Sequence, residues 1–377
     1  MNTVTALLPR ISRKSRPTTI WRRSALAALA FAAAFLSSCG GSDDAENADV
    51  ATATESAVAA FGFTPSDITL RESGELKELL DDSLIFVDAS GRQWTAPKGT
   101  LTDGASVPRL ALPVTDGRWS REFLKAAVVH DAYCQTENEN RAPDQYRKRT
   151  WRDVHRMFYE ATLAGGTSPT LAKIMFAAVW LGGPRWDDPG NDLQAVSADV
   201  MTMGYVGTKQ WIEENDPNVD EIIANIEARE PVLVSFSNLE SSISTALEQG
   251  DTRWAESLLQ EQERLVNTEL GKAPQDLMNQ SFSGFLHKNK AQYFIRVNAP
   301  ERARIEVTTS GAAFQSVLED EPRVPTVLNG LANVSVIDGD LDNAERLQRE
   351  ALALKPDYEP AQKDLQRIEM MRDRPNP

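Results

Sequence analysis

Residues that end helices occur at intervals after Val232, and they constrain the fold of the chain more than any other feature. Apolar residues recur there at helical spacing, and the pattern stops at Gly250-Asp251, at Asn298-Ala299-Pro300 and at Gly339-Asp340. Glycine admits the left-handed conformation that ends a helix and proline cannot continue one, so each stop predicts a tight turn. We therefore expect residues 232–377 to fold as an all-α array of helical hairpins.

The expected hairpins can be located along the chain. They pair Leu239–Gln249 with Ala255–Val266, Leu277–Val297 with Glu301–Glu321, and the two halves of Pro325–Tyr358, and Glu359–Met371 follows as a capping helix. A terminal helix of such an array must present a polar outer face, which this last segment can do.

The segment Pro325–Tyr358 resembles one tetratricopeptide repeat. The residues that carry the resemblance are Leu331-Ala332, Gly339-Asp340, Ala344, Ala351 and Pro356. Small residues are needed there because two antiparallel helices must approach closely. Ser335 and Gln348 depart from the pattern, which usually has aromatic residues at these positions. The resemblance implies a concave surface that binds a protein partner; a non-repetitive helical bundle with one such repeat is the alternative.

Residues 61–186 show a different pattern, typical of an α+β domain in which a small sheet packs on helices. Ser83–Asp88 and Gln93–Ala96 are apolar segments around a short glycine-containing turn, which predicts a β-hairpin. Helical spacing follows over Trp119–Cys134, Tyr146–Leu163 and Pro169–Leu181.

The next segment, residues 187–231, is acidic and rich in loop-forming residues. We expect it to be a linker that contains a short helix over Asp220–Arg229. It would separate the α+β domain from the helical domain at 232–377.

The first 38 residues indicate secretion. Six basic side chains and no acidic one precede the apolar run Ala25–Leu36, which is too short to span a bilayer core of about 30 Å. The run ends in Leu36-Ser37-Ser38-Cys39-Gly40, which resembles the lipobox of bacterial lipoproteins. The resemblance implies that residues 1–38 are a cleaved signal peptide and that Cys39 is acylated. Residues 39–60 are small and acidic and are expected to be a disordered linker. An ordinary signal peptide with an incidental cysteine is the alternative.

Charge limits the partners of the chain. Its formal charge is −15, and removal of residues 1–38 with their six basic side chains shifts that charge to −21. Nucleic acid is therefore not expected as a partner, because its phosphates repel such a surface. Attachment to the membrane would come from lipid on Cys39. Cys134 is the one other cysteine, so no internal disulfide is expected.

These features predict an extracytoplasmic protein that is anchored by lipid to the cell membrane. In a bacterium with two membranes, we expect the outer membrane, facing the periplasm. The reason is that Gly40 follows Cys39 where an aspartate would resemble an inner-membrane retention signal.

Motifs between residues 83 and 186 resemble a known family. The loop Thr102-Asp103-Gly104-Ala105-Ser106-Val107-Pro108-Arg109 is followed in order by Val129-His130-Asp131, by Phe158-Tyr159-Glu160-Ala161 and by Gly182-Gly183. Together they resemble a bacterial and phage family that is catalogued as domain of unknown function number 1353. The resemblance implies a fold neighbourhood and candidate site residues, but no reaction. The family usually has aspartate where this chain has His155, so an all-carboxylate site does not carry over directly.

The candidate catalytic residues are Asp103, His130, Asp131 and His155. Zinc prefers imidazole and carboxylate ligands, so Asp103, His130 and His155 would bind a divalent metal such as zinc if they converged on one cleft. Cys134 lies one helical turn beyond His130 and would offer a fourth ligand. Adjacent residues of a helix point about 100° apart, so His130 and Asp131 need not face one site.

Two readings without a metal stay open. In the first, a histidine acts as general base and Ser106 as nucleophile. In the second, Asp103 only closes its Asp-Gly turn, and His130 and Cys134 are packed core residues.

The sequence thus leaves two hypotheses about function. The first is a membrane-anchored scaffold that binds a protein through its helical repeats. The second is a hydrolase of the cell envelope that uses the candidate residues of the α+β domain.

Overall fold

The computed structural model describes residues 61–74, 76–104, 119–188, 190 and 192–373. Every structural statement below concerns these residues. Cys39, the signal and linker segments and Ser106 lie outside them, so the predictions about those residues stay predictions.

Two small antiparallel sheets begin the described chain. Their strands are β1 (Gly62–Thr64), β2 (Leu70–Ser73), β3 (Leu76–Leu79), β4 (Ser83–Val87), β5 (Gln93–Pro97) and β6 (Leu101–Thr102). One sheet has the order β1-β4-β5 and the other β2-β3-β6. The predicted hairpin is confirmed as β4 and β5, which pair from Ser83 with Pro97 to Val87 with Gln93.

The turn between β4 and β5 is held by the carboxylate of Asp88. Its Oδ1 accepts hydrogen bonds from the backbone N–H groups of Ser90 and Arg92, each at 2.9 Å. Its Oδ2 accepts one from Nε1 of the buried Trp94, also at 2.9 Å. An aspartate before a glycine-containing turn favours this geometry, because its side chain can bond to backbone groups two residues further on.

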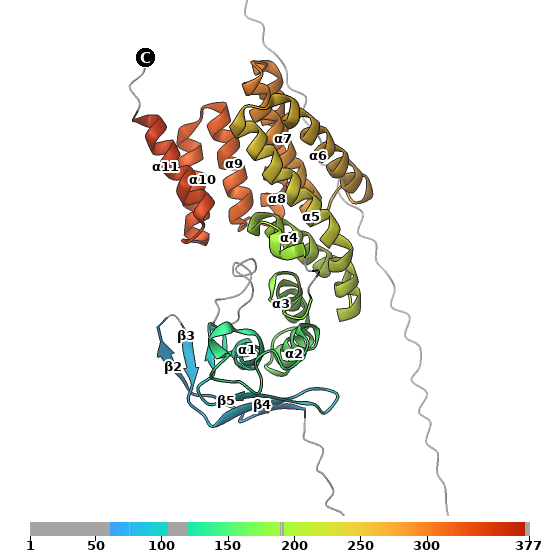
Figure 1. Ribbon diagram of the computed structural model, residues 1–377, viewed down its shortest axis with the longest axis vertical. Helices are drawn as coiled ribbons and strands as arrows, with labels where there is room; N and C mark the ends of the chain where they lie inside the picture. Colours follow the sequence, from blue (N-terminus) through green and yellow to red (C-terminus); the bar gives the residue numbers. More distant parts are fainter. Residues whose placement is uncertain (1–60, 75, 105–118, 189, 191, 374–377) are drawn as a thin grey trace, which may run out of the picture. The chain divides into compact units, whose positions relative to one another are not determined.

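Three helices follow: α1 (Arg121–Cys134), α2 (Trp151–Ala164) and α3 (Pro169–Gly182). Helix α1 packs on β4 and β5, α2 packs on α1, and α3 packs on α2. In Figure 1, α1 and α2 lie along the face of β4 and β5. Local sequence explains where the helices begin. The hydroxyl of Thr150 accepts the backbone N–H of Asp153, and Ser168 caps α3 ahead of a proline at its first position.

The loop expected for residues 187–231 is not what forms. After a short 3₁₀ turn (Asp192–Ala195), the segment contains α4 (Ala198–Asn215) and the first part of α5 (Val219–Gln249). The expected short helix, Asp220–Arg229, is only the beginning of α5, which continues through Pro231. Helix α4 was not predicted because acidic residues near its ends are typical of loops. At the start of α5 such residues stabilise the helix, since Asn218 and Glu221 form a capping box. The boundaries of the domains themselves stay a prediction.

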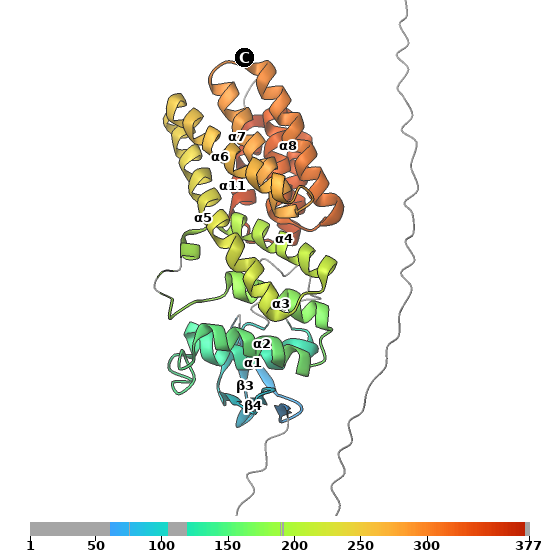
Figure 2. The same cartoon turned by 90° about the vertical axis from the view of Figure 1, so that its right-hand side faces the viewer.

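The all-α array predicted from the helix stops is confirmed. After α5 come α6 (Thr252–Lys272), α7 (Leu277–Arg296), α8 (Pro300–Asp320), α9 (Pro325–Asp338), α10 (Leu341–Leu354) and α11 (Glu359–Arg372). Figure 2 shows α7 and α8 as one long hairpin. Gly250 and Gly339 end α5 and α9 with φ of +75° and +85°, the left-handed caps that the sequence predicted.

Small residues and rings bring the helices of the array together. Gly284 of α7 and Gly330 of α9 both face the ring of Phe314 on α8, and a Cβ at either glycine would lie within 2.6 Å of that ring. Phe236 of α5 stacks on Phe282 of α7 with ring centroids 3.8 Å apart. A hydrophobic core runs from the sheet through α1–α5 to α7 and α9.

The two positions that depart from the tetratricopeptide pattern are filled by hydrogen bonds. Buried Gln348 donates from Nε2 to Oδ1 of Asn329 at 2.8 Å, and Ser335 accepts from Nδ2 of Asn343 at 2.8 Å. Polar pairs across α9 and α10 therefore occupy space that aromatic rings usually fill. The tetratricopeptide resemblance itself stays a prediction.

Among the described residues, no helix is both long enough and apolar enough to cross a membrane.

Candidate functional site

Helix α1 brings three polar side chains together in the interior. His130 and Cys134 are one turn apart, and Nδ1 of His130 lies 3.3 Å from Sγ of Cys134. The same Nδ1 lies 3.5 Å from Oδ1 of Asp131. Adjacent side chains usually diverge by about 100° on a helix, yet here His130 and Asp131 turn toward one another. All three are buried, with His130 only 2% exposed.

His155 of α2 completes this group, which we call the buried cluster (His130, Asp131, Cys134 and His155). Its Nδ1 lies 3.0 Å from Nε2 of His130. The rings of Trp151, Trp180 and Trp186 surround it at centroid distances of 5.4–6.4 Å. The two histidines that the motifs singled out therefore do meet, through opposite nitrogens of two rings.

Burial fixes the protonation of His155. It lowers the pKa of His155 well below the ordinary range, and the charges of His130 and Arg185 lower it further. The backbone carbonyl of Pro184 opposes this lowering of the pKa. By strict hydrogen-bond geometry, Nε2 of His155 has no partner among the described residues. His155 is therefore neutral at pH 7, so its Nδ1 can accept a hydrogen bond from the Nε2–H of His130.

Gly183 makes room for His155. A Cβ at this position would lie 2.8 Å from Nε2 of His155 and 2.3 Å from the carbonyl oxygen of Val179. The sequence predicted the glycine pair only as a helix stop. Its second role is to let the backbone at the end of α3 approach the imidazole.

Thr102 and Asn138 are site residues that sequence reasoning missed. The hydroxyl of Thr102 donates to Oδ2 of Asp131 at 2.6 Å and accepts the backbone N–H of Gly104 at 3.1 Å. Buried Asn138 joins β6 to α1, because it bonds to both backbone groups of Leu101 and to the carbonyl of Asp131, each at 2.8 Å. Thr102 could have been found from the sequence, because it directly precedes Asp103 in the motif. Asn138 lies outside every motif.

Asp103 follows β6 and is partly buried beside the cluster. Burial raises the pKa of Asp131 from 3.8 to about 6, and the charge of Asp103 contributes to that increase. Burial also raises the pKa of the Cys134 thiol well above its ordinary value, with the charges of Asp131 and Asp103 adding to the shift. The candidate carboxylates are thus electrostatically coupled to the cluster.

The imidazole, carboxyl and thiol groups of the buried cluster are of the kinds that can bind a metal ion or transfer a proton. His130, Asp131 and Cys134 offer three ligand atoms that lie within 4.8 Å of one another. A hydrolase also needs space for water and a substrate next to these groups. Two cavities can be outlined from the described residues, and neither is lined by residues of the cluster.

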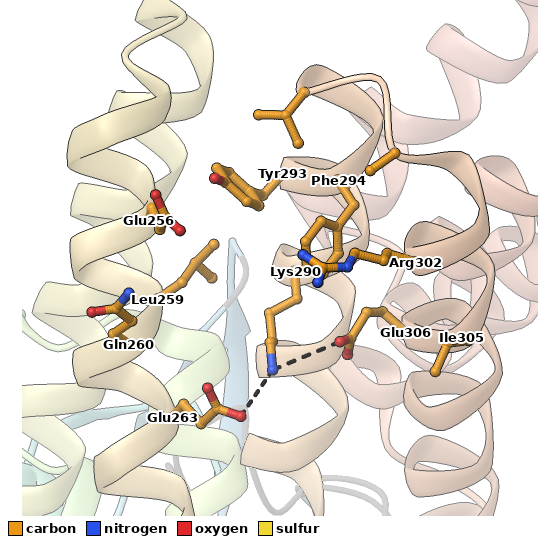
Figure 3. A pocket seen from close by; sticks show the side chains of 12 residues that line it. Glu256, Leu259, Gln260, Glu263, Lys290, Tyr293, Phe294, Arg302, Ile305 and Glu306 are labelled. Carbon is orange, nitrogen blue, oxygen red and sulfur yellow. Dashed lines mark hydrogen bonds and ion pairs between the residues drawn. The ribbon is translucent and has the colours of Figure 1, made fainter.

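The larger of these cavities lies in the helical array, between α6, α7 and α8 (Figure 3). We call it the α6–α8 groove, and its volume is about 490 Å³. Leu259, Tyr293, Phe294, Val297 and Ile305 supply its apolar surface. Two of these apolar side chains are exposed to an unusual degree, Ile305 at 65% and Val297 at 38%.

Charged groups of the groove fall into two sets. Lys290 is held by Glu263 at 2.8 Å and by Glu306 at 3.7 Å, as the dashed lines of Figure 3 show. Arg302 instead lies over the ring of Phe294, 5.3 Å from its centroid. No carboxylate of the described residues is within ion-pair distance of its guanidinium, so Arg302 can receive an anion from outside.

Comparison with known proteins finds a family model that matches part of the α+β region. Residues 79–179 match the model of a family described as "Protein of unknown function (DUF1353)". This confirms the resemblance seen in the TDGASVPR loop and the His-Asp motif. The matched range includes Asp103 and the whole buried cluster, but not the helical array.

Two relatives from Sinorhizobium fredii (strain NBRC 101917 / NGR234) share this region. The uncharacterised protein y4iH is 39% identical over 109 residues, which are 29% of this chain and 41% of y4iH. The uncharacterised protein y4jT is 36% identical over 107 residues, which are 28% of this chain and 29% of y4jT. The matched part thus spans less than half of each relative. No solved structure matches the chain.

Proposed function

We propose that this chain is a lipid-anchored extracytoplasmic scaffold, which binds a segment of a partner protein in the α6–α8 groove. The observation that carries the proposal is the groove itself, where exposed apolar side chains surround an arginine with no ion-pair partner among the described residues. An apolar hollow that also holds a cation is a candidate site for a partner of matching chemistry.

The chemistry of the groove defines the segment that fits. An apolar side chain would pack on Leu259 and Phe294 at the floor of the groove. A carboxylate next to it would pair with Arg302, whose planar guanidinium binds carboxylates through two hydrogen bonds. We therefore propose an apolar segment with an acidic residue or a C-terminal carboxylate as the occupant.

The neighbouring ion pairs support this choice over a basic segment. Glu263 and Glu306 already neutralise Lys290, and Glu306 also pairs with His287. Burial raises the pKa of the Tyr293 hydroxyl, and the charge of the nearby Glu256 raises it further. A basic segment would have to displace these contacts, whereas an acidic one meets Arg302 directly.

Selection of peptides on the full chain tests the proposal. A randomised peptide library displayed on phage is panned against the protein, and the Kd of each enriched peptide is measured by fluorescence anisotropy. We expect enriched peptides to combine leucine, isoleucine or phenylalanine with an acidic group. Arg302→Glu and Ile305→Asp should each weaken binding by about tenfold or more, as for a residue central to an interface.

Arg304→Glu is the matched control, because Arg304 is exposed on the same helix but does not line the groove. This variant should bind the peptides as the unchanged protein does. Replacing the acidic residue of the peptide with lysine should restore binding to Arg302→Glu. Peptides that bind Arg302→Glu and Ile305→Asp at full affinity would refute the proposed groove.

The lipid anchor is supported by the sequence around Cys39 and is tested separately. Cells that express the full chain are grown with an alkyne-labelled fatty acid, and the protein is recovered and examined for label. The label should be present in the unchanged protein and absent from Cys39→Ser. Equal labelling of both proteins would show that Cys39 is not the anchor.

A further inference from the structure

Two of the three separations between ligand atoms of the buried cluster match those around a metal ion. Metal bonds of about 2.0–2.3 Å around a tetrahedral centre place neighbouring nitrogen, oxygen and sulfur ligands roughly 3.3–3.6 Å apart. Nδ1 of His130 lies 3.3 Å from Sγ of Cys134 and 3.5 Å from Oδ1 of Asp131. The third separation, between Oδ1 of Asp131 and Sγ of Cys134, is within 4.8 Å, so one ion could contact all three atoms after side-chain movements.

The surrounding contacts orient these atoms as the second shell of a metal site would. A ligating histidine commonly donates its other ring N–H to an acceptor, which fixes the ring and its tautomer. Nε2 of His130 faces Nδ1 of His155 at 3.0 Å, which leaves Nδ1 of His130 directed at Asp131 and Cys134. Oδ2 of Asp131 is held by the Thr102 hydroxyl at 2.6 Å, so its Oδ1 faces His130.

We infer that Nδ1 of His130, Oδ1 of Asp131 and Sγ of Cys134 bind one divalent transition-metal ion of the zinc type. The thiolate selects such ions over magnesium or calcium, which prefer oxygen ligands. The site is separate from the α6–α8 groove and does not depend on the proposed scaffold function.

This ligand set differs from the one that the sequence suggested. His155 is a positioning residue here, because its Nδ1 is engaged by His130 rather than directed at the ion. Cys134 and Asp131 take part because they share the face of α1 that carries His130. Three protein ligands leave one tetrahedral position, for which Asp103 or a water molecule is the candidate.

Cobalt loading of the purified full chain tests the inference. Co²⁺ binds zinc sites, and a Co–thiolate bond gives a charge-transfer band in the near ultraviolet. We expect this band with about one cobalt ion per chain, and release of the Cys134 proton on binding. Cys134→Ser, which nearly conserves volume, should lose the band, and His130→Ala should lose the ion.

Two further variants separate ligation from packing. His287→Ala changes the third histidine of the chain, which pairs with Glu306 in the array, and should keep the band and the stoichiometry. His155→Asn should weaken cobalt binding by about 10- to 100-fold while keeping the band, as loss of a second-shell partner does. Circular dichroism checks that each variant is folded.

Two results of these measurements would contradict the proposed metal site, and one would contradict the role of His155. Absence of a charge-transfer band in the folded unchanged protein overturns the site, and so does a band that persists in Cys134→Ser. Unchanged cobalt affinity of His155→Asn overturns its positioning role.

Discussion

Histidines occur in two regions of this molecule under opposite conditions. In the buried cluster, His130 meets His155 among tryptophan rings, and burial keeps His155 neutral. In the helical array, His287 is partly exposed and pairs with the carboxylate of Glu306. The same type of side chain is thus desolvated in one region and in contact with a carboxylate in the other.

The difference indicates what each region can bind. Buried polar groups are costly to leave unpaired, so the cluster tolerates only small changes and suits a ligand of fixed size and geometry. Ion pairs near the surface contribute little each, so the groove can exchange partners at small cost. A metal ion fits the first condition, and a protein segment fits the second.

The largest effect expected from this contrast is a pH dependence that comes from Asp131. Its pKa of about 6 in the folded protein exceeds the ordinary 3.8, so the folded state binds the proton more tightly. The free energy of unfolding should therefore fall as pH rises from about 4 to about 6, by about 3 kcal/mol. Asp131→Asn removes this loss, so the variant should gain stability relative to the unchanged protein over the same pH range.

Urea denaturation at several pH values, with a chelator present, measures this difference. His155 contributes in the opposite direction, because its lowered pKa makes stability fall as pH drops below about 6.5. Comparing Asp131→Asn with the unchanged protein cancels that contribution. Asp144→Asn replaces an exposed carboxyl outside the cluster and is the control. Parallel stability curves for Asp131→Asn and the unchanged protein would show that Asp131 titrates normally.

A smaller effect is expected from packing around His155. Gly183→Ala places a Cβ against Nε2 of His155 and against the Val179 carbonyl, which must move apart. We expect a loss of about 1–3 kcal/mol, as for other overpacked sites. Thermal and urea unfolding measure it.

The array provides the matched comparison for Gly183→Ala. Gly311 lies inside α8, and a Cβ there would meet only a Val334 methyl group at 3.9 Å. Gly311→Ala should therefore stabilise the protein by about 0.5–1 kcal/mol through reduced backbone freedom. If both substitutions changed the free energy of unfolding in the same direction, close packing would not explain why position 183 is a glycine.

Sequence reasoning predicted the array better than it predicted the middle of the chain. The ends of α5 and α9 follow from Gly250 and Gly339, because a left-handed cap is a property of a few adjacent residues. Helix α4 was missed because it is buried by several neighbours at once, so its apolar residues do not form one clear stripe. Leu233 and Met278 pack against Gly204 and Gly207 of α4, and neither contact is visible in the local sequence.

The candidate site was predicted from the sequence only in part. The motifs singled out His130 and His155, which meet in the structure, and Asp103, which is coupled to Asp131 through its charge. The role of these residues as a functional site stays a prediction. Thr102 and Asn138 were missed, because their roles depend on β6 lying beside α1. The α6–α8 groove was also beyond prediction, since its residues come from three helices.

By itself, the sequence determined the β4–β5 hairpin, the turns of the array and the similarity of residues 79–179 to a known family, because these depend on short-range chemistry and recognisable motifs. Tertiary structure alone decided which nitrogen of His130 faces Asp131 and Cys134, and it placed Arg302 in the α6–α8 groove, over the ring of Phe294. Those choices depend on distances between side chains from different elements, and such distances are set only when the helices pack.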